Sequence, residues 1–223
     1  MTGETALSPT TAPGSARVAR TRRRLIDAAL TMLDAADARG DLSVADLARM
    51  AGVSRPTFYQ HFGDTATLIR VAALTRLDHA FRQVPAEALG DSWTAFAGST
   101  IRTLLTELCA NRTFYLRTLN GCASDALMND VIDYLADRLL NASPLGPIIR
   151  RHPGPDTAED RAAFLAAGVV WHVRRWLERT TSQDEIESVG EVLILLLRAS
   201  GANADELAAA GAAAQAQPPE VAP

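Results

Sequence analysis

Apolar residues recur every three or four positions along most of the chain, which is the spacing of one buried helix face. Residues 17–38 show this spacing first, and their apolar stripe consists of Leu25, Ile26, Ala29, Leu30 and Leu33. Long alternating runs of Val, Ile, Thr and Tyr are missing, and the composition is dominated by Ala, Leu and Arg, which all favour helix. The pattern predicts an all-α fold.

Glycine and proline divide this pattern into nine predicted helices. Gly40, the turn Ala51-Gly52-Val53 and the pair Gly63-Asp64 separate the first four. Four prolines between residues 144 and 155 predict one long loop after the seventh helix. The predicted helices cover residues 17–38, 44–50, 55–61, 65–81, 92–110, 112–119, 123–141, 157–179 and 183–200.

Residues 43–62 have the spacing of a helix-turn-helix. Ser43 and Ser54 are each placed to cap a short helix, and Gly52 permits a left-handed turn between the two helices. Pro56 falls in a first helical turn, where its missing N–H costs nothing. The inner faces would be packed by Leu47, Ala51, Val53 and Phe58. The outer face of the second helix would present groups suited to phosphates and base edges, namely Arg55, Thr57, Tyr59, Gln60 and His61.

The alternative to a helix-turn-helix is a plain helical hairpin in an all-α core. The distribution of charge favours the helix-turn-helix. The net charge is −4, and all 22 cationic residues are arginine. Residues 17–62 contain eight Arg and five Asp, which gives +3, whereas residues 63–223 contain fourteen Arg and twenty acids, which gives −6. An anionic partner is therefore expected for the N-terminal part alone.

Five of these arginines lie within residues 17–24. A helix N-terminus disfavours cations, because the helix dipole places partial positive charge there. A solvated helix start is the alternative interpretation, but contact with phosphates explains the cluster better. Arg20 and Arg24 are the arginines for which this contact is most expected.

Residues 17–81 closely resemble the N-terminal domain of the tetracycline-repressor (TetR) family. The resemblance rests on Ser43, Leu47-Ala48, Ala51-Gly52-Val53-Ser54, Thr57-Phe58-Tyr59 and Phe62. It implies that Ser43, Thr57 and Tyr59 touch the phosphate backbone, while Arg55, Pro56, Gln60 and His61 face bases or sugars. Thr65 stands where the family usually has a lysine that contacts a phosphate. The predicted DNA-binding residues are Arg20, Arg24, Ser43, Ser54, Arg55, Pro56, Thr57, Tyr59, Gln60 and His61.

The last two predicted helices carry more apolar surface than one chain can readily cover. Residues 183–200 are apolar nearly all round, and residues 157–179 have a second broad apolar face in which Gly168 would allow a close helix approach. The resemblance implies that both helices pair with their copies in a four-helix homodimer interface, and a monomeric core is the alternative. The predicted interface residues are Leu165, Gly168, Val169, Trp176, Val189, Leu193 and Leu196.

Residues 92–140 hold more than half of the aromatic residues outside the N-terminal domain. The resemblance implies that these helices line a pocket for a small effector, which we expect to be largely apolar or aromatic and to release the DNA. A filled core without room for a ligand is the alternative. The predicted ligand-binding residues are Trp93, Phe96, Thr100, Leu104, Phe114, Tyr115, Leu119, Cys122 and Tyr134.

The predicted domain organisation has four parts. Residues 1–16 form a disordered tail, residues 17–63 the helix-turn-helix domain, residues 64–201 the effector-binding and dimerisation domain, and residues 202–223 an Ala/Pro-rich tail. The predicted protein is a nine-helix, two-domain, homodimeric repressor that binds double-stranded DNA.

Several other classes of protein are disfavoured. The absence of lysine excludes Schiff-base and P-loop lysine chemistry. Cys109 and Cys122 are too far apart for a CxxC site and are expected to be small buried residues in a reduced, cytoplasmic setting. The N-terminus lacks the apolar core of a signal peptide, and the longest apolar run, residues 192–197, is far short of the ~20 residues that span a bilayer. The isolated histidines predict no metal, and no cofactor is expected.

Two rival functions remain open from the sequence. An all-α enzyme would need paired carboxylates or an activated nucleophile, and Asp130, Asp133 and Asp137 share one helix face, as solvent-facing acids also do. A ligand-binding protein that no longer uses its DNA-binding domain is the second rival, and Thr65 is the residue that suggests it. Retention of DNA in a shift assay separates both rivals from a repressor.

Overall fold

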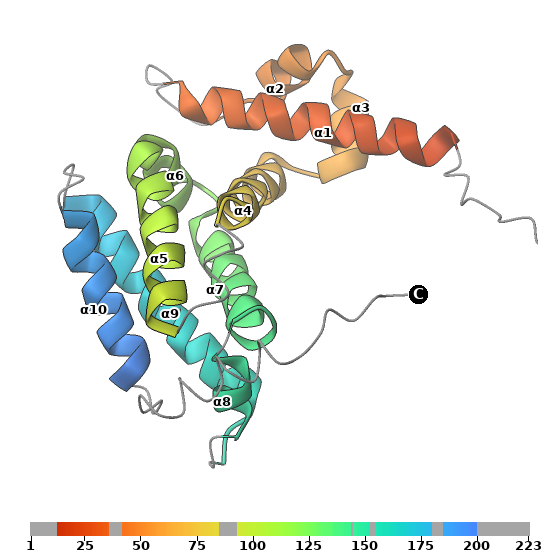
Figure 1. The fold of residues 1–223 in the computed structure, drawn as a ribbon. Coiled ribbons are helices and arrows are strands. Elements are labelled where there is room, and N and C mark those ends of the chain that lie inside the picture. The colour runs from red at the N-terminus through yellow and green to blue at the C-terminus, as the bar shows by residue number, and fades with distance from the viewer. Residues whose placement is uncertain are drawn as a thin grey trace, which may run out of the picture. The chain divides into compact units, whose positions relative to one another are not determined.

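The computed structural model describes residues 13–35, 42–84, 93–143, 145–151, 155–179 and 185–199, without the side chains of residues 13–14, 93–96 and 196–199. Within these ranges the chain forms helices and no strand, which confirms the predicted all-α fold. The helices are α1 (Pro13–Asp34), α2 (Val44–Ala51), α3 (Arg55–Phe62), α4 (Thr65–Arg82), α5 (Trp93–Ala110), α6 (Arg112–Leu119), α7 (Ser124–Asn141), α8 (Gly146–Arg151), α9 (Ala158–Arg179) and α10 (Ile186–Ala199) (Figure 1).

The chain divides into two compact units, residues 1–72 and 73–223. The division falls inside α4, and the predicted domain boundary after residue 63 lies within the first unit. The first half of α4 contributes to the core of that unit, because its side chains Leu68 and Ile69 are buried. A single helix thus begins in one unit and ends in the other.

The N-terminal unit is built around the predicted stripe of α1. Leu25, Ala29 and Leu33 are buried, whereas Ile26 and Leu30 are half-buried. The helix begins at Pro13, ahead of its predicted start at residue 17, and residues 36–38 of the predicted helix lie outside the described residues. From the other helices of the unit the core receives Leu47, Ala48, Ala51, Phe58 and Phe62.

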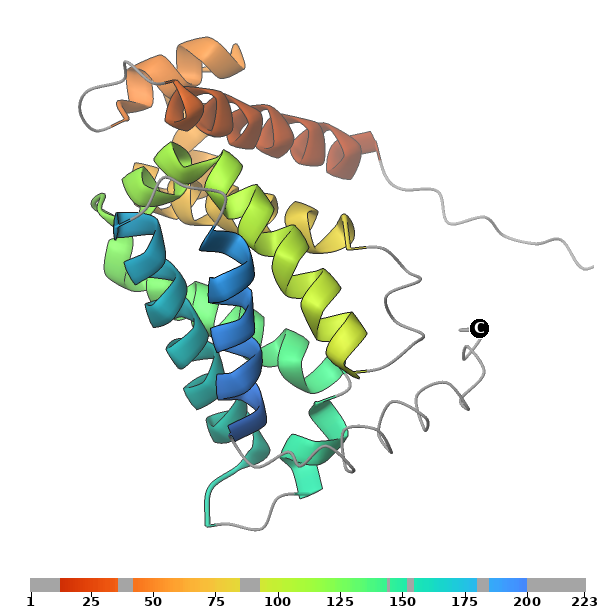
Figure 2. The same cartoon turned by 60° about the vertical axis from the view of Figure 1, so that its left-hand side comes forward.

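The C-terminal unit is organised around α7 and α9, which pack against each other, while α10 packs against α5 (Figure 2). Small side chains mark the centre of this core, where Ala136 of α7 and Ala162 and Ala166 of α9 are buried. Such small residues let helix axes approach closely, because little side-chain volume separates them. The helices α9 and α10 also lie side by side, as both cartoon views show.

The helix α8 corrects the predicted long loop between residues 142 and 156. Pro147 lies in its first turn, where a missing N–H is tolerated, so the proline starts a helix instead of preventing one. Gly146 lies so close to the Leu140 carbonyl that a Cβ atom would collide with it. Ile149 is buried in the core of the unit, and Arg150 donates from Nη1 to the Leu140 carbonyl (2.8 Å). The sequence therefore contains ten helices in its described part, not nine.

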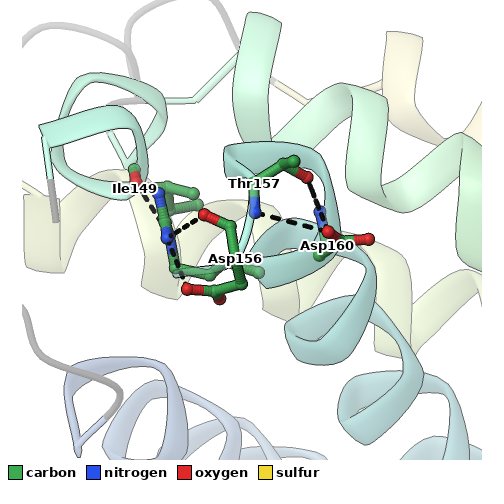
Figure 3. Close-up of polar contacts among 5 residues, drawn as sticks. Ile149, Asp156, Thr157 and Asp160 are labelled. Carbon is green, nitrogen blue, oxygen red and sulfur yellow. Dashed lines mark hydrogen bonds and ion pairs between the residues drawn. The ribbon is translucent and has the colours of Figure 1, made fainter. Parts of the chain in front are cut away.

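The start of α9 is fixed by a reciprocal cap and an arginine (Figure 3). The Thr157 hydroxyl accepts from the Asp160 N–H (3.0 Å) and donates to the Asp160 carboxylate (2.8 Å). These hydrogen bonds to Thr157 hold the pKa of Asp160 below its ordinary value. Arg161 donates to the Ile149 carbonyl (3.2 Å) and to the Asp156 carboxylate (2.9 Å), which ties the end of α8 to the start of α9.

Removing this cap should destabilise the protein. Thr157→Ala is expected to lower the free energy of unfolding by about 1 kcal/mol, measured by urea denaturation at neutral pH. Thr113→Ala, at an exposed threonine in the first turn of α6, is the matched control and should change stability by less than about 0.5 kcal/mol.

The difference between the two variants should also depend on pH. A carboxyl group whose pKa is lowered by folding stabilises the protein above its unfolded pKa, and this contribution is lost as the pH falls below the ordinary value of 3.8. The cost of Thr157→Ala should therefore shrink in acid, provided the fold persists there. An equal loss in both variants would contradict the role of the cap.

Candidate functional site

The turn between α2 and α3 has the geometry expected of a helix-turn-helix. Gly52 ends α2 in the left-handed conformation (φ 60°, ψ 43°), which confirms the predicted reason for a glycine at this position. The Gly52 N–H donates to the Arg49 carbonyl (3.1 Å), and the Val53 N–H donates to the Ala48 carbonyl (2.9 Å). The last carbonyls of α2 are thus satisfied while the chain reverses toward α3.

Both predicted serine caps are present. Ser43 accepts from the Asp46 N–H (3.1 Å) and donates to the Asp46 carboxylate (2.6 Å), and this hydroxyl is the main cause that lowers the pKa of Asp46. Ser54 accepts from the Thr57 N–H (3.3 Å), and the two hydroxyl oxygens of Ser54 and Thr57 are 2.8 Å apart. The Ser43 proton is therefore committed to Asp46, whereas one of the two protons in the Ser54–Thr57 pair is left for another acceptor.

The outer face of α3 is polar and accessible. Arg55, Pro56, Tyr59 and Gln60 are exposed, while the predicted Thr57 and His61 are half-buried. Tyr59 is 54% exposed. Its ring packs edge-to-face against the Phe58 ring, with centroids 5.5 Å apart and an interplanar angle of 90°. Tyr59 therefore presents its phenol end at the surface beside other exposed polar groups.

The arginine cluster of α1 has two different roles. Arg22 donates from Nη1 to the His61 carbonyl (3.3 Å) and lies 4.5 Å from the centre of the Phe62 ring. Arg24 donates from Nη2 to the Gly52 carbonyl (3.3 Å) at the turn. Cations at such positions satisfy the carbonyls at helix C-termini. The phosphate contact of Arg24 stays a prediction, for an exposed guanidinium that donates one hydrogen bond inside the domain.

Arg17, Arg20 and Arg23 remain exposed. In the described part of the chain, no hydrogen bond or ion pair engages their guanidinium groups. Arg20 thus keeps the availability that was predicted for it, and Arg17 lies three residues before it on the same helix. The N-terminal unit therefore offers free positive charge on α1 and a polar face on α3.

Sequence comparison places this geometry in a family. A profile described as "Bacterial regulatory proteins, tetR family" matches residues 25–72, which contain the whole helix-turn-helix. Over these residues the chain matches the TetR family. An uncharacterised HTH-type transcriptional regulator of Haemophilus influenzae is 44% identical over 45 residues. That match covers 20% of this chain and 22% of the relative, so it spans about a fifth of either protein.

Solved structures resemble the fold of this chain over most of its length. The transcriptional repressor QsdR of R. erythropolis, from the TetR family, has a TM-score of 0.54 and 13% identity, and the match covers 83% of this chain and 96% of that one. The structure of RolR in complex with resorcinol has a TM-score of 0.52 and 20% identity, and the match covers 93% and 100%. At these identities the likeness concerns the fold alone.

The start of α4 departs from the family pattern at Thr65. This residue is the first of the helix, and the preceding Asp64 caps it by accepting from the Thr67 N–H (2.6 Å). Hydrogen bonds from Thr67 are the main cause that lowers the pKa of Asp64. A negative charge and a helix start thus stand beside the position at which the family usually has a lysine.

The second candidate site is a row of three adjoining cavities in the C-terminal unit. We name each after one lining residue: the Leu119 cavity (about 130 Å³), the Ala97 cavity (about 110 Å³) and the Arg138 cavity (about 190 Å³). Phe81 and Leu135 line all three. The Ala97 cavity is the middle one, because it shares Ile101 and Leu104 with the first and Thr100 with the third.

The predicted ligand-binding residues divide into three groups. Thr100, Leu104, Tyr115 and Leu119 line the cavities. Phe114 is buried under the Arg76 guanidinium, Cys122 is exposed and Tyr134 contacts the Phe81 ring, and none of the three lines these cavities. The side chains of Trp93 and Phe96 lie outside the described residues.

Several residues that line the cavities were not predicted from the sequence to bind a ligand. From α4 and α7 the cavities receive Leu77, Phe81, Val131 and Leu135, and from α9 and α10 they receive Val170, Val173 and Leu177 together with two predicted interface residues, Val169 and Leu193. The helical period of α4 and α7 marks these residues as buried. It does not distinguish a residue that lines a cavity from one in a filled core.

The predicted interface residues differ in their exposure. Trp176, Val189 and Leu193 are buried within a single chain, so little of their surface is left for a second copy. Leu165 packs against the core cluster of the unit, Gly168 is exposed, and the side chain of Leu196 lies outside the described residues.

Other apolar residues of α9 and α10 are accessible instead. Phe164 is 78% and Trp171 57% exposed, and both lie on one face of α9 with Gly168 between them. Val192 and Leu195 are the exposed apolar residues of α10. We call these four residues the α9–α10 face.

The remaining expectations concern chemistry. Cys109 is half-buried and Cys122 exposed, and both are free, so the prediction that both are buried is wrong. Within the described ranges no group of three or more His, Cys, Asp or Glu residues could hold a metal ion, and no helix is long and apolar enough to cross a membrane. Asp133 and Asp137 are exposed on α7 and line none of the three cavities.

The left-handed backbone of Gly52 provides a test of the turn. Gly52→Ala is expected to lower the free energy of unfolding by about 1 kcal/mol, because a Cβ atom is strained at this positive φ. Gly98→Ala is the matched control: this helical glycine of α5 has open space around it, so the change should stabilise by about 0.5 kcal/mol. Urea denaturation of both variants measures the difference. A neutral or stabilising Gly52→Ala would contradict the assigned turn.

Proposed function

We propose that the protein is a sequence-specific DNA-binding transcriptional repressor, which acts as a homodimer and leaves its operator when a small, largely apolar ligand binds. The observation that carries this proposal is the outer face of α3, where Arg55, Tyr59 and Gln60 are exposed on a helix locked by a capped turn. The family match over residues 25–72 supports it.

On DNA, α3 would enter the major groove. Gln60 can read an adenine through two hydrogen bonds, and Arg55 can read a guanine in the same way. Tyr59 and the Ser54–Thr57 hydroxyl pair would contact phosphates, as would Arg17 and Arg20 on α1. Phosphate contacts would set the register, and base contacts would give the specificity.

A second copy of the chain would cover the α9–α10 face. Phe164 and Trp171 present large apolar area, and the exposed Gly168 has no atom within 4 Å of the position of a Cβ. A helix from the partner could therefore approach closely between the two rings. The symmetry of such a pair would present two copies of α3, and a palindromic operator requires them to lie about 34–36 Å apart.

Regulation would start in the row of cavities. The RolR structure contains resorcinol, and the corresponding proposal here is a small ligand held among α4, α5, α7 and α9. The helix α4 begins in the N-terminal unit and supplies Leu77 and Phe81 to the Leu119 cavity, so a ligand can act on the DNA-binding unit through this helix. A coupling of about 1–3 kcal/mol would change operator affinity by roughly 5–150-fold.

The DNA-binding proposal is tested with a duplex selected by the wild-type protein from a randomised pool. Gln60→Ala should weaken binding by about 1–3 kcal/mol and relax specificity at one position, because it removes a base contact. Tyr59→Ala should weaken binding to all duplexes by about 1 kcal/mol, because it removes a phosphate contact. Fluorescence anisotropy at several salt concentrations measures both effects.

Arg102→Ala is the control for these variants, because Arg102 pairs with Glu187 in the C-terminal unit (2.7 Å) and is far along the chain from the helix-turn-helix. All variants should keep the wild-type melting temperature within a few degrees, since each side chain is exposed. If the Tyr59 and Gln60 variants bound as the wild type does while Arg102→Ala did not bind, the assignment of α3 would be wrong.

The dimer is tested by placing a charge on the α9–α10 face. The wild type should sediment as two chains at micromolar concentration, and Phe164→Arg should raise the dissociation constant by more than about a hundredfold, because the charge would be buried against apolar groups. Asp133→Arg introduces the same side chain at an exposed site on α7 and should leave the dimer intact. A monomeric wild type that still bound its operator would contradict the proposed assembly.

A further inference from the structure

The Arg138 cavity differs from the other two in its polarity. It is lined by Thr100, Arg138 and Ser143 as well as by apolar side chains, whereas the Ala97 cavity has Thr100 as its single polar side chain. The Ser143 hydroxyl is already used, since it donates to the Leu139 carbonyl (2.7 Å) and accepts from the Leu145 N–H (3.2 Å). Arg138 and Thr100 are therefore the groups that a ligand can address.

The Arg138 guanidinium is held in place without a carboxylate partner. Its central carbon lies 4.3 Å from the centre of the Phe81 ring and 5.8 Å from that of Tyr134. The Tyr134 hydroxyl donates to Asp78 (3.0 Å), and Asp78 also pairs with Arg82, so this carboxylate is engaged elsewhere. Among the residues that the structure describes, no carboxylate forms an ion pair with Arg138. A fixed, half-buried cation at a cavity is suited to a planar anion.

Thr100 provides a second polar group at the junction. Its hydroxyl oxygen is buried and has no hydrogen-bond partner in the described part of the chain. Because Thr100 lines both the Arg138 and the Ala97 cavities, an oxygen atom of a ligand that passes from one to the other could meet this hydroxyl. A buried hydroxyl without a partner is unfavourable, and such a ligand would relieve that cost.

The far end of the row offers no cation comparable to Arg138. In the Leu119 cavity, the Thr118 hydroxyl donates to the Tyr115 carbonyl (2.9 Å), and Arg174 is engaged by Glu178 (2.9 Å) and Asn120 (3.1 Å). The remaining lining is aliphatic except for Phe81 and Tyr115, and the Tyr115 hydroxyl is buried. An apolar cavity of about 150 Å³ accepts a group as large as a benzene ring, and this cavity, at about 130 Å³, is close to that size.

From this arrangement we infer that the ligand of the cavity row is an amphiphilic monocarboxylate. Its carboxylate binds Arg138 in a bidentate manner, one carboxylate oxygen accepts from Thr100, and its apolar body extends through the Ala97 cavity into the Leu119 cavity. The inference rests on the proposed function in one respect, since it names the chemical class of the effector. It concerns binding, which is measurable without DNA.

Octanoate and octanamide are the probes, because they share one apolar chain and differ in the charge of the head group. Isothermal titration of the full-length wild type, without DNA, should show octanoate binding about tenfold more tightly than octanamide, as expected for a hydrogen-bonded ion pair at a half-buried site. Butanoate should bind more weakly than octanoate, because its chain is too short to reach the Leu119 cavity.

Variants assign this preference to residues. Arg138→Gln should abolish the difference between octanoate and octanamide, and Arg138→Lys should keep part of it, because the charge remains without the bidentate geometry. Thr100→Val, which is close in shape, should weaken octanoate binding by a few-fold. Arg175→Gln is the matched control: Arg175 also stacks on an aromatic ring, 4.8 Å from the centre of Trp171, but lines none of the cavities, so it should bind octanoate as the wild type does.

Three results would overturn the inference: equal binding of octanoate and octanamide by the wild type, a carboxylate preference that survives in Arg138→Gln, or no binding of octanoate. Tighter binding of octanamide would indicate an uncharged ligand class instead. Octanoate that binds through Arg138 but leaves DNA affinity unchanged would support the carboxylate site and contradict the release step of the proposed function. The two failures are therefore distinguishable.

Discussion

The burial of Phe58 is the constraint on which the DNA-binding surface depends. The helix α3 has eight residues, and a helix of that length is not stable by itself in water. Phe58 is fully buried and Phe62 nearly so, which fixes the inner side of α3 to the rest of the unit. With this side held, Arg55, Tyr59 and Gln60 have a fixed outward direction. Caps at both ends, Ser54 and Gly63, limit the helix to the residues that this packing supports.

The arginines of α1 differ in their contacts. Arg22 and Arg24 reach the His61 and Gly52 carbonyls, and in this way they fasten the end of α3 and the turn to α1. Arg17, Arg20 and Arg23 carry the charge that is left for a partner. One cluster in the sequence thus combines positioning within the domain with the proposed recognition of an anion.

The sequence was informative where the structure is determined by neighbouring residues. The serine caps, the left-handed Gly52 and the helix spacing all follow from local rules, and each is present. The sequence was uninformative where contacts between distant segments determine the structure. The helix α8 depends on the close approach of Gly146 to Leu140. The prolines in and around it led to the prediction of a loop instead. The periodicity of α9 and α10 marked both helices as apolar on two sides, but it could not tell that Val169 and Leu193 face the cavities while Phe164 and Trp171 face outward.

The central claim is that two copies of α3, held by their buried phenylalanines and paired across the α9–α10 face, bind one DNA site. Hydroxyl-radical footprinting of the full-length protein on a selected duplex tests it most directly. We expect two protected segments whose centres are about 10–10.5 base pairs apart on one face of the duplex, with sequences related by two-fold symmetry. A single protected segment, or uniform protection without sequence preference, would contradict it.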